Sequence, residues 1–319
     1  MSKVLAVDLG GTKIYSALVN RSGEITSGDI RPTNAQDGYQ GVVKRILASI
    51  ARVNTLDEPA VGVGVAVPAY IDPQEGRILF APNLKWQAVD LKKDLEDALG
   101  LPVWLDNDAN LAALGEHRYG AGKGYHNLVY ITVSTGVGGG LILDGKLYRG
   151  AFGGAGEFGH MIAAPEGPGC SCGNIGCLEG VASGCAIKRE AQNLVKSGRG
   201  HHMLSLAGTI EKIDARVVGQ AAAEGDLDAQ EILARAGRYL GIAIASVANL
   251  LNPEVFIIGG GVACGVGKLI LDPAFNEAYR RTYPPYRDSL KIVPAVLRAQ
   301  TGVLGAAAYA WDQLDQIKR

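Results

Sequence analysis

The chain has 319 residues, a length that corresponds to about two domains of ordinary size. Hydrophobic residues make up 47% and charged residues 20% of it, and 31 basic against 32 acidic residues leave a net charge of −1. This composition excludes intrinsic disorder and gives no electrostatic sign of a nucleic-acid or anionic membrane partner. The longest segment without a charged side chain, 124–143, contains five glycines, so we expect no membrane span. Lys3 leads directly into a strand pattern without a signal peptide, which predicts a cytoplasmic protein.

The hydrophobic pattern alternates between strands and helices, as is typical of an α/β protein. In the first half we expect strands at 4–7, 13–19, 25–30, 61–67 and 103–105, and helices around 43–50, 90–99 and 109–118. In the second half we expect strands at 128–134, 140–143, 255–258 and 292–297, and helices at 226–251 and 303–314. A strand, a glycine turn and a second strand open each half, which indicates a weak internal duplication with a boundary near 119–126.

Two glycine-rich turns between strands have the composition of phosphate-binding loops. The first is Asp8-Leu-Gly-Gly-Thr-Lys13, where backbone N–H groups, a hydroxyl and a lysine charge would face an anion and Asp8 would hold Mg²⁺. The second is Ser134-Thr-Gly-Val-Gly-Gly-Gly140. Each turn alone could be an ordinary hairpin, but two of them can hold the two ends of one polyphosphate. A third glycine run, Gly259–Gly261, ends a strand before a helix and offers bare backbone to a nucleoside.

Asn107 and Asp108 end a predicted strand and open a helix, where α/β sheets place their ligands. Asp108 could be no more than the helix N-cap. Near a phosphate site, its carboxylate would instead be a general base that accepts the proton of a hydroxyl during phosphoryl transfer.

The strongest local signal is His160 followed by Cys170, Cys172 and Cys177. Three thiols and one imidazole form a closed tetrahedral set for a structural Zn²⁺. Disulfides are the competing interpretation, which the expected reducing compartment disfavours. Glu157 and Glu179 bracket this segment. They could be ordinary surface carboxylates, or hydrogen-bond acceptors that the metal loop orients toward a polyhydroxylated ligand.

Two further cysteines, Cys185 and Cys264, have no ligand spacing, so we expect them to be small buried hydrophobic residues.

Taken together, these motifs resemble the ROK family of sugar kinases, within the actin, hexokinase and Hsp70-like ATPase superfamily. The resemblance runs in order along the whole chain and also includes Asn83, in Ala-Pro-Asn-Leu84. It implies that Asp108 is the catalytic base and that the sugar is bound by Asn83, Asn107, Asp108, Glu157, His160 and Glu179. It also implies an ATP site formed by Asp8, Gly10, Gly11, Thr12, Lys13, Thr135, Gly136, Gly138, Gly260 and Gly261.

We therefore expect two actin-like (ribonuclease H-like) α/β domains around a central cleft, one of residues 1–118 plus 301–319 and one of residues 119–300. The expected activity is transfer of phosphate from ATP, with Mg²⁺, to the 6-hydroxyl of a hexose, glucose first, in carbohydrate metabolism and glycolysis. A kinase for N-acetylmannosamine or N-acetylglucosamine is the alternative within this class. Two alanines, Ala66 and Ala69, stand where the family often has glycine, and their methyl groups would leave less room for an N-acetyl group.

A sugar-responsive transcription regulator is the alternative from another class. Such regulators carry a helix-turn-helix ahead of the kinase-like part, and Met1 lies three residues before the first strand, so we disfavour it. A catalytically dead sugar-binding module would have lost Asp108 or the phosphate loops. We expect a homodimer or homotetramer whose ligands are a hexose and ATP, with no nucleic-acid or membrane partner.

Overall fold

The computed structural model describes residues 2–54, 59–72 and 75–317. It divides into two compact units, the first of Met1–His126, Gly140–Gly156 and Val296–Arg319 and the second of Asn127–Gly139 and Glu157–Ala295. Residues 119–126, 140–156 and 296–300, which were expected in the second domain, thus group with the first unit.

A five-stranded sheet with the strand order β3-β2-β1-β4-β8 forms the centre of the first unit. The chain first builds an antiparallel meander, because tight turns join β1 to β2 and β2 to β3, and then adds β4 and β8 parallel to β1. The strands are β1 (Lys3–Leu9), β2 (Lys13–Asn20), β3 (Ile25–Pro32), β4 (Ala60–Val67) and β8 (Val103–Asn107).

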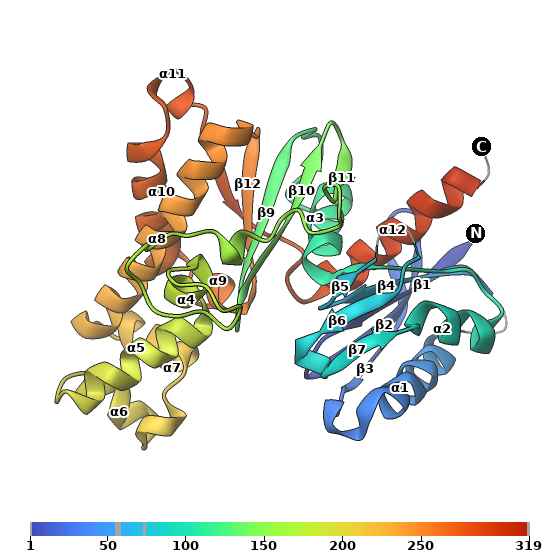
Figure 1. Cartoon of the computed structure of the whole chain (residues 1–319), viewed down its shortest axis with the longest axis horizontal. Helices are drawn as coiled ribbons and strands as arrows, with labels where there is room; N and C mark the ends of the chain where they lie inside the picture. The colour runs from blue at the N-terminus through green and yellow to red at the C-terminus, as the bar shows by residue number, and fades with distance from the viewer. Residues whose placement is uncertain (1, 55–58, 73–74, 318–319) are drawn as a thin grey trace. The chain divides into compact units, whose positions relative to one another are not determined.

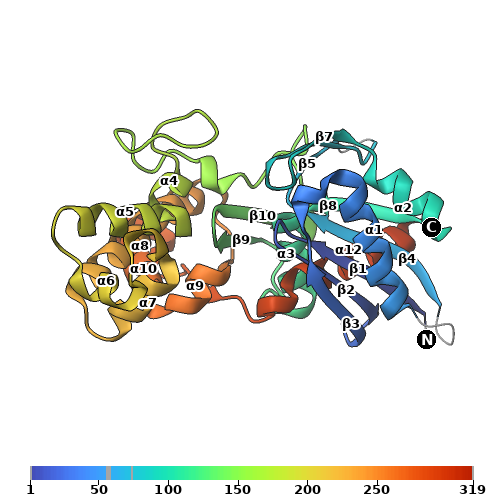
Figure 2. The same ribbon diagram turned by 90° about the horizontal axis from the view of Figure 1, so that it is seen from below.

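Helices cover both faces of this sheet (Figure 2). Because side chains alternate along a strand, Leu5 and Val7 of β1 join one buried cluster with α1 (Gly38–Val53) and α2 (Leu91–Leu99). The opposite face packs against α12 (Thr301–Ile317), which also contacts α3 (Asp108–Tyr119). A Cβ atom on Gly64 of β4 would lie 2.0 Å from the backbone oxygen of Ala306, so glycine permits the close approach of α12.

A small antiparallel sheet, which the sequence pattern did not predict, follows β4. Its strands are β5 (Tyr70–Ile71), β6 (Ile78–Ala81) and β7 (Trp86–Val89), in the order β5-β6-β7. The strands have two to four residues, too few for an alternating pattern to stand out. The link between β6 and β7 contains Asn83.

A second five-stranded sheet has the order β11-β10-β9-β12-β13. Strands β9 and β13 run parallel to β12, and β11 pairs antiparallel with β10. The strands are β9 (Leu128–Val133), β10 (Val137–Leu143), β11 (Lys146–Tyr148), β12 (Val255–Gly259) and β13 (Ile292–Pro294).

Helices make up most of the second unit, where α8 contacts α4, α5, α7 and α10 (Figure 1). The long α8 carries Gly237 and Gly241 where the backbone of α10 passes, and a Cβ atom at either position would lie 2.4 Å from a backbone oxygen. These helices are α4 (Leu178–Ala182), α5 (Gly184–Lys196), α6 (His201–Ala207), α7 (Ala215–Ala223), α8 (Leu227–Leu251), α9 (Gly261–Val266), α10 (Lys268–Arg281) and α11 (Pro284–Arg287).

A fully buried residue, Glu116 in α3, binds the segment that precedes the first exit of the chain from the first unit and the segment of its last return. Its oxygens accept hydrogen bonds from the N–H groups of Ala121 at 2.9 Å, Val296 at 3.1 Å and Leu297 at 2.9 Å. Burial of a charge is tolerated where several donors replace water, so these two segments have a defined path at the edge of the unit. No helix among the described residues is long and apolar enough to cross a membrane.

Candidate functional site

The turn between β1 and β2 is a tight hairpin. The N–H of Gly10 donates to the carbonyl of Lys13 at 2.9 Å, and the Thr33 hydroxyl donates to the carbonyl of Gly10 at 2.7 Å. A Cβ atom on Gly11 would lie 3.5 Å from the Cβ atom of Asn83, so the turn packs beside this exposed asparagine. The first unit therefore brings together the predicted phosphate loop and Asn83, a residue predicted to bind the sugar.

Asp8 lies near the end of β1, where the first turn of α12 packs against it. A Cβ atom on Gly302 would lie 2.6 Å from the Asp8 carboxyl carbon, which shows how closely the helix approaches. Desolvation raises the pKa of Asp8, and the charge of Lys13 acts in the opposite direction. A partly buried carboxylate of this kind fits a cation, since a nearby positive charge would favour its ionised form.

In the turn from β8 into α3, the structure shows which residue is the helix N-cap, a role that the sequence left open for Asp108. Asn107 is the N-cap, because its Oδ1 accepts hydrogen bonds from the N–H groups of Ala109 at 2.9 Å and Asn110 at 3.2 Å. Asp108 is the first residue of the helix, and its carboxylate also accepts from Ala109 at 2.9 Å. The N-cap is therefore Asn107, and Asp108 is the first residue of the helix itself.

An ion pair that the sequence did not indicate stabilises the residue that precedes this turn. The Nε of Arg149 donates to the buried Asp106 carboxylate at 2.6 Å. That carboxylate also accepts from the Asn107 N–H at 2.7 Å and from the Asn110 side chain at 3.0 Å. The Arg149 guanidinium lies over the ring of Tyr309, 5.0 Å from its centre. Two helices and the segment after β11 thus hold the residue that precedes Asn107 and Asp108.

In the second unit, the predicted glycine loop is shorter than expected, because β10 already begins at Val137. The turn itself closes with the Ser134 N–H donating to the carbonyl of Gly136 at 2.9 Å. Glu179 Oε2 accepts a hydrogen bond from the Val137 N–H at 3.0 Å, and a Cβ atom on Gly136 would lie 2.3 Å from the same oxygen. Glu179, a residue predicted to bind the sugar, therefore contacts the predicted phosphate loop.

The three cysteines and one histidine form a compact donor cluster. Their ligand atoms all lie within 4.8 Å of one another, with 3.7 Å between Cys172 Sγ and Cys177 Sγ and 3.9 Å between Cys170 Sγ and His160 Nδ1. Sulfur atoms of a disulfide would be about 2.05 Å apart. A tetrahedron with Zn–S bonds of about 2.3 Å has sulfur–sulfur edges of about 3.8 Å. The arrangement therefore fits a tetrahedral metal ion and is not a disulfide.

Glu157 and His160 belong to the 3₁₀ turn that leads into the cluster. His160 directs Nδ1 toward Cys170, and its Nε2 lies 3.9 Å from Glu157 Oε2. The imidazole can therefore face the cluster with one nitrogen while the other remains beside a predicted sugar ligand. Both side chains are partly exposed to solvent.

A cavity of about 680 Å³ adjoins the second glycine loop. Ser134, Thr135 and Gly261 line it together with side chains of α5 and α7, among them Lys188 and Gln220. Gly260 approaches β9 so closely, at φ +92°, that a Cβ atom would lie 2.3 Å from the Val133 oxygen. The sequence did not point to the residues of α5 and α7, because no motif marks these helices.

The prediction that Cys185 and Cys264 are buried is wrong. Both thiols are exposed, and Cys185 lines this cavity.

Comparison with known proteins identifies the family. A profile described as the ROK family matches residues 4–313, and the chain belongs to this family. The chain is 37% identical over 313 residues to a glucokinase of Thermotoga maritima, with 98% of each chain covered. It resembles the crystal structure of a ROK family glucokinase from Streptomyces griseus in complex with glucose and AMPPNP, with a TM-score of 0.86, 36% identity and coverage of 98% of this chain and 100% of that one. It is also 33% identical over 312 residues to a xylose repressor of Caldicellulosiruptor bescii, covering 97% of this chain and 78% of the repressor.

The mixed α/β architecture and the family predicted from the sequence are both confirmed by these matches.

Proposed function

We propose that the protein is an ATP-dependent glucokinase that phosphorylates the 6-hydroxyl of glucose. The observation that carries the proposal is the turn at Asn107 and Asp108, where a separate N-cap leaves a carboxylate at the start of a helix in a chain with two glycine phosphate loops. Near-full-length identity to glucokinases supports the same activity. The structure bound to glucose and AMPPNP supports both ligands.

Asp108 is the proposed general base. Its carboxylate accepts the proton of the 6-hydroxyl while the sugar oxygen forms a bond to the γ-phosphorus of ATP. The bond between the γ-phosphorus and the oxygen that bridges to the β-phosphate breaks, and ADP leaves with that electron pair. Asn107 fixes the helix end on which Asp108 lies, and Arg149 holds the preceding Asp106.

The proposed sugar contacts come from both units. Asn83, Asn107 and Asp108 belong to the first unit, and Glu157, His160 and Glu179 to the second. Amide, imidazole and carboxylate groups pair with hydroxyl groups and reject ligands that leave them without a partner. His160 would donate from Nε2, because its Nδ1 faces the thiol cluster.

The proposed nucleotide site uses the two glycine turns for phosphates and the 680 Å³ cavity for the nucleoside. Gly10, Gly11, Thr12 and Lys13 contribute from the first unit, and Thr135, Gly136, Gly138, Gly260 and Gly261 from the second. Asp8 is the proposed contact for Mg²⁺ or its water shell, and the ion would neutralise charge on the transferred phosphate group.

The proposed zinc site is structural. Burial raises the pKa of the Cys177 thiol to about 12, and the neighbouring thiols of Cys172 and Cys170 act in the same direction. A divalent cation reverses this preference, because it binds thiolates and favours ionisation. All four positions of the tetrahedron belong to the protein, so the ion would rigidify the segment between Glu157 and Glu179 and take no substrate.

A kinase for N-acetylhexosamines is the second candidate within this class. The expected steric argument now rests on Ala69 more than on Ala66, since Ala66 is fully buried inside β4 and Ala69 retains 5% exposure. The Ala69 carbonyl accepts from the Asn107 side chain at 3.3 Å, so the backbone of Ala69 lies beside a residue proposed to bind the sugar. A coupled assay of ADP release across glucose, mannose, fructose, allose and the two N-acetylhexosamines tests the proposal, and no turnover with any of them would refute it.

A transcription regulator is the candidate of another class, suggested by the identity to a xylose repressor. The retained Asp108 and both glycine turns favour the enzyme. We further propose a cytoplasmic homodimer or homotetramer acting in glycolysis, which size-exclusion chromatography with light scattering and cell fractionation would test.

A further inference from the structure

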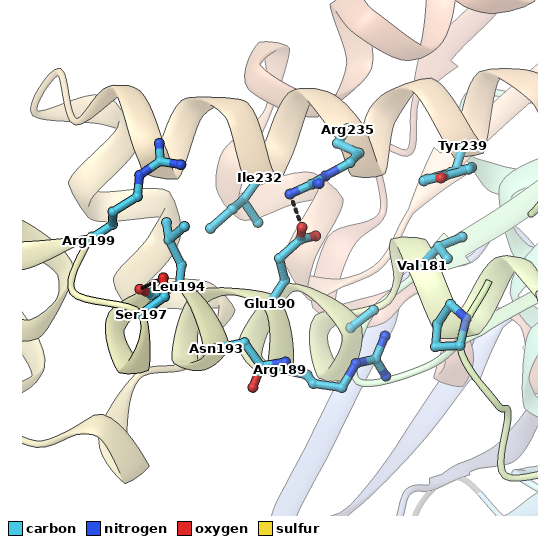
Figure 3. A pocket seen from close by; sticks show the side chains of 12 residues that line it. Val181, Arg189, Glu190, Asn193, Leu194, Ser197, Arg199, Ile232, Arg235 and Tyr239 are labelled. Carbon is cyan, nitrogen blue, oxygen red and sulfur yellow. Dashed lines mark hydrogen bonds and ion pairs between the residues drawn. The ribbon is translucent and has the colours of Figure 1, made fainter. Parts of the chain in front are cut away.

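A separate cavity of the second unit, of about 520 Å³, is lined by residues of α5 and α8 and takes no part in the proposed reaction. Figure 3 shows Glu190 on α5 pointing toward Arg235 on α8, Arg189 extending along the side of α5 that faces away from α8, and Arg199 at the other end. Small-molecule sites in proteins have volumes of about 300–1,000 Å³, so this cavity has the size of a metabolite site.

The charge of this lining is positive, although the whole chain has a net charge of −1. Three arginines and one glutamate contribute to it, an excess of two positive charges. Arg235 forms an ion pair with Glu190, and Arg199 forms one with Asp228 outside the lining. Arg189 instead donates to the neutral carbonyl of Gly180. Among the described residues it forms no ion pair with a carboxylate.

The walls between these charges are apolar. Val181, Leu194 and Ile232 line the cavity beside the ring of Tyr239. Guanidinium groups bind phosphate oxygens through paired hydrogen bonds, and apolar walls suit the carbon skeleton of the same ligand. A phosphate monoester carries about −1.5 to −2 charges at neutral pH. Because Arg199 is paired with Asp228 and Arg235 with Glu190, Arg189 is the arginine of the lining whose charge such a group meets first.

We propose that this cavity binds a small phosphorylated metabolite, with its phosphate on Arg189 and Arg235. Glu190 then acts as the internal competitor that a ligand displaces from Arg235. The cavity is also connected to α4, because Arg189 donates to the carbonyl of Gly180 and Gly180 follows Glu179. A phosphate that draws Arg189 away from Gly180 loosens this hold and weakens sugar binding, a regulatory role that rests on the proposed function of Glu179.

Titration calorimetry with glycerol 3-phosphate tests binding, with glucose and AMPPNP present in excess to occupy the proposed active site. We expect one saturable site per chain and none for uncharged glycerol. Arg189→Gln and Arg235→Gln each weaken binding at least about tenfold, or about 1.4 kcal/mol, and Glu190→Gln strengthens it. The matched control is Arg238→Gln, one turn along α8, where Arg238 pairs with Glu231 at 2.7 Å outside the cavity lining and binding stays unchanged.

Absence of saturable binding up to about 10 mM, or equal affinities in all four variants, would overturn the site. Circular dichroism shows whether a variant is folded. If either Arg189→Gln or Arg235→Gln unfolds, the affinity of the other variant for glycerol 3-phosphate is the test. The regulatory role has its own measurement: glycerol 3-phosphate should raise the glucose Kd of the wild type and leave that of Arg189→Gln unchanged. An unchanged glucose Kd in a wild type that binds both ligands overturns regulation, whereas absent glucose binding refutes the proposed function and leaves the phosphate titration interpretable.

Discussion

The Glu179 carboxylate accepts a hydrogen bond from the backbone N–H of Val137 at 3.0 Å. Val137 begins β10 directly after the glycine turn, and Glu179 lies in α4 directly after the last cysteine of the thiol cluster. One carboxylate therefore links the proposed phosphate loop to the proposed sugar-binding segment.

Substitutions of Glu179 should separate these two roles. In Glu179→Gln the amide oxygen can still accept from Val137, so we expect the KM for glucose to rise about tenfold and the KM for ATP to change little. In Glu179→Ala the Val137 N–H loses its partner, and both KM values should rise. Steady-state kinetics measure the difference, with Glu224→Gln, an exposed carboxylate of the same unit, as the control. Equal effects of the two substitutions on ATP would refute the link.

Asp108→Asn tests the proposed base. The amide cannot take a proton, while Asn107 continues to cap the helix, so we expect kcat to fall by about 10² or more with a modest change in glucose affinity. Asp226→Asn is the matched control, since Asp226 also lies at a helix start and accepts from Ala229 at 2.8 Å. Near-full turnover in Asp108→Asn would assign the carboxylate a structural role.

Arg149→Gln tests the support behind the base. Loss of the ion pair leaves the buried Asp106 carboxylate with fewer donors, and we expect kcat to fall about tenfold while the KM for ATP is kept. Guanidinium ion added to Arg149→Ala should restore part of the lost kcat. Arg118→Gln removes another ion pair of the first unit, with Asp312, and should leave kcat unchanged. A loss of stability in Arg149→Gln with normal kcat would contradict a positioning role.

Metal removal tests the thiol cluster. Elemental analysis should find about one zinc per chain, and Cys172→Ser should lower both the melting temperature and the glucose affinity. Cys264→Ser alters an exposed thiol outside the cluster and should change neither. Protein without metal but with full glucose affinity would overturn the zinc proposal.

Sugar selection tests the pocket. We expect kcat/KM for glucose to exceed that for N-acetylglucosamine and N-acetylmannosamine at least about tenfold, which corresponds to about 1.4 kcal/mol of transition-state discrimination. Ala69→Gly, which removes a methyl group beside the Asn107 contact, should narrow this ratio. A higher kcat/KM for an N-acetylhexosamine would refute glucose as the substrate and retain the kinase.

The sequence predicted the parts of the fold that local patterns encode. The strands of the first sheet and the helix at 227–251 lie where apolar periodicity placed them, because their burial repeats along the chain. Short elements such as β5 and α4 have too few residues for a period. Contacts such as Arg149 with Asp106 join positions 43 residues apart, and a local pattern contains no information about such partners.

The most direct test of the central claim is the identity of the product made by purified protein from glucose and ATP with Mg²⁺, followed by ³¹P NMR. The account predicts one ADP for each glucose consumed, a single phosphate ester on the 6-oxygen, no product from 6-deoxyglucose, and formation of the ester slowed by about 10² or more in the Asp108→Asn variant. Phosphate on another sugar oxygen, or ADP release that does not depend on the sugar, would contradict it.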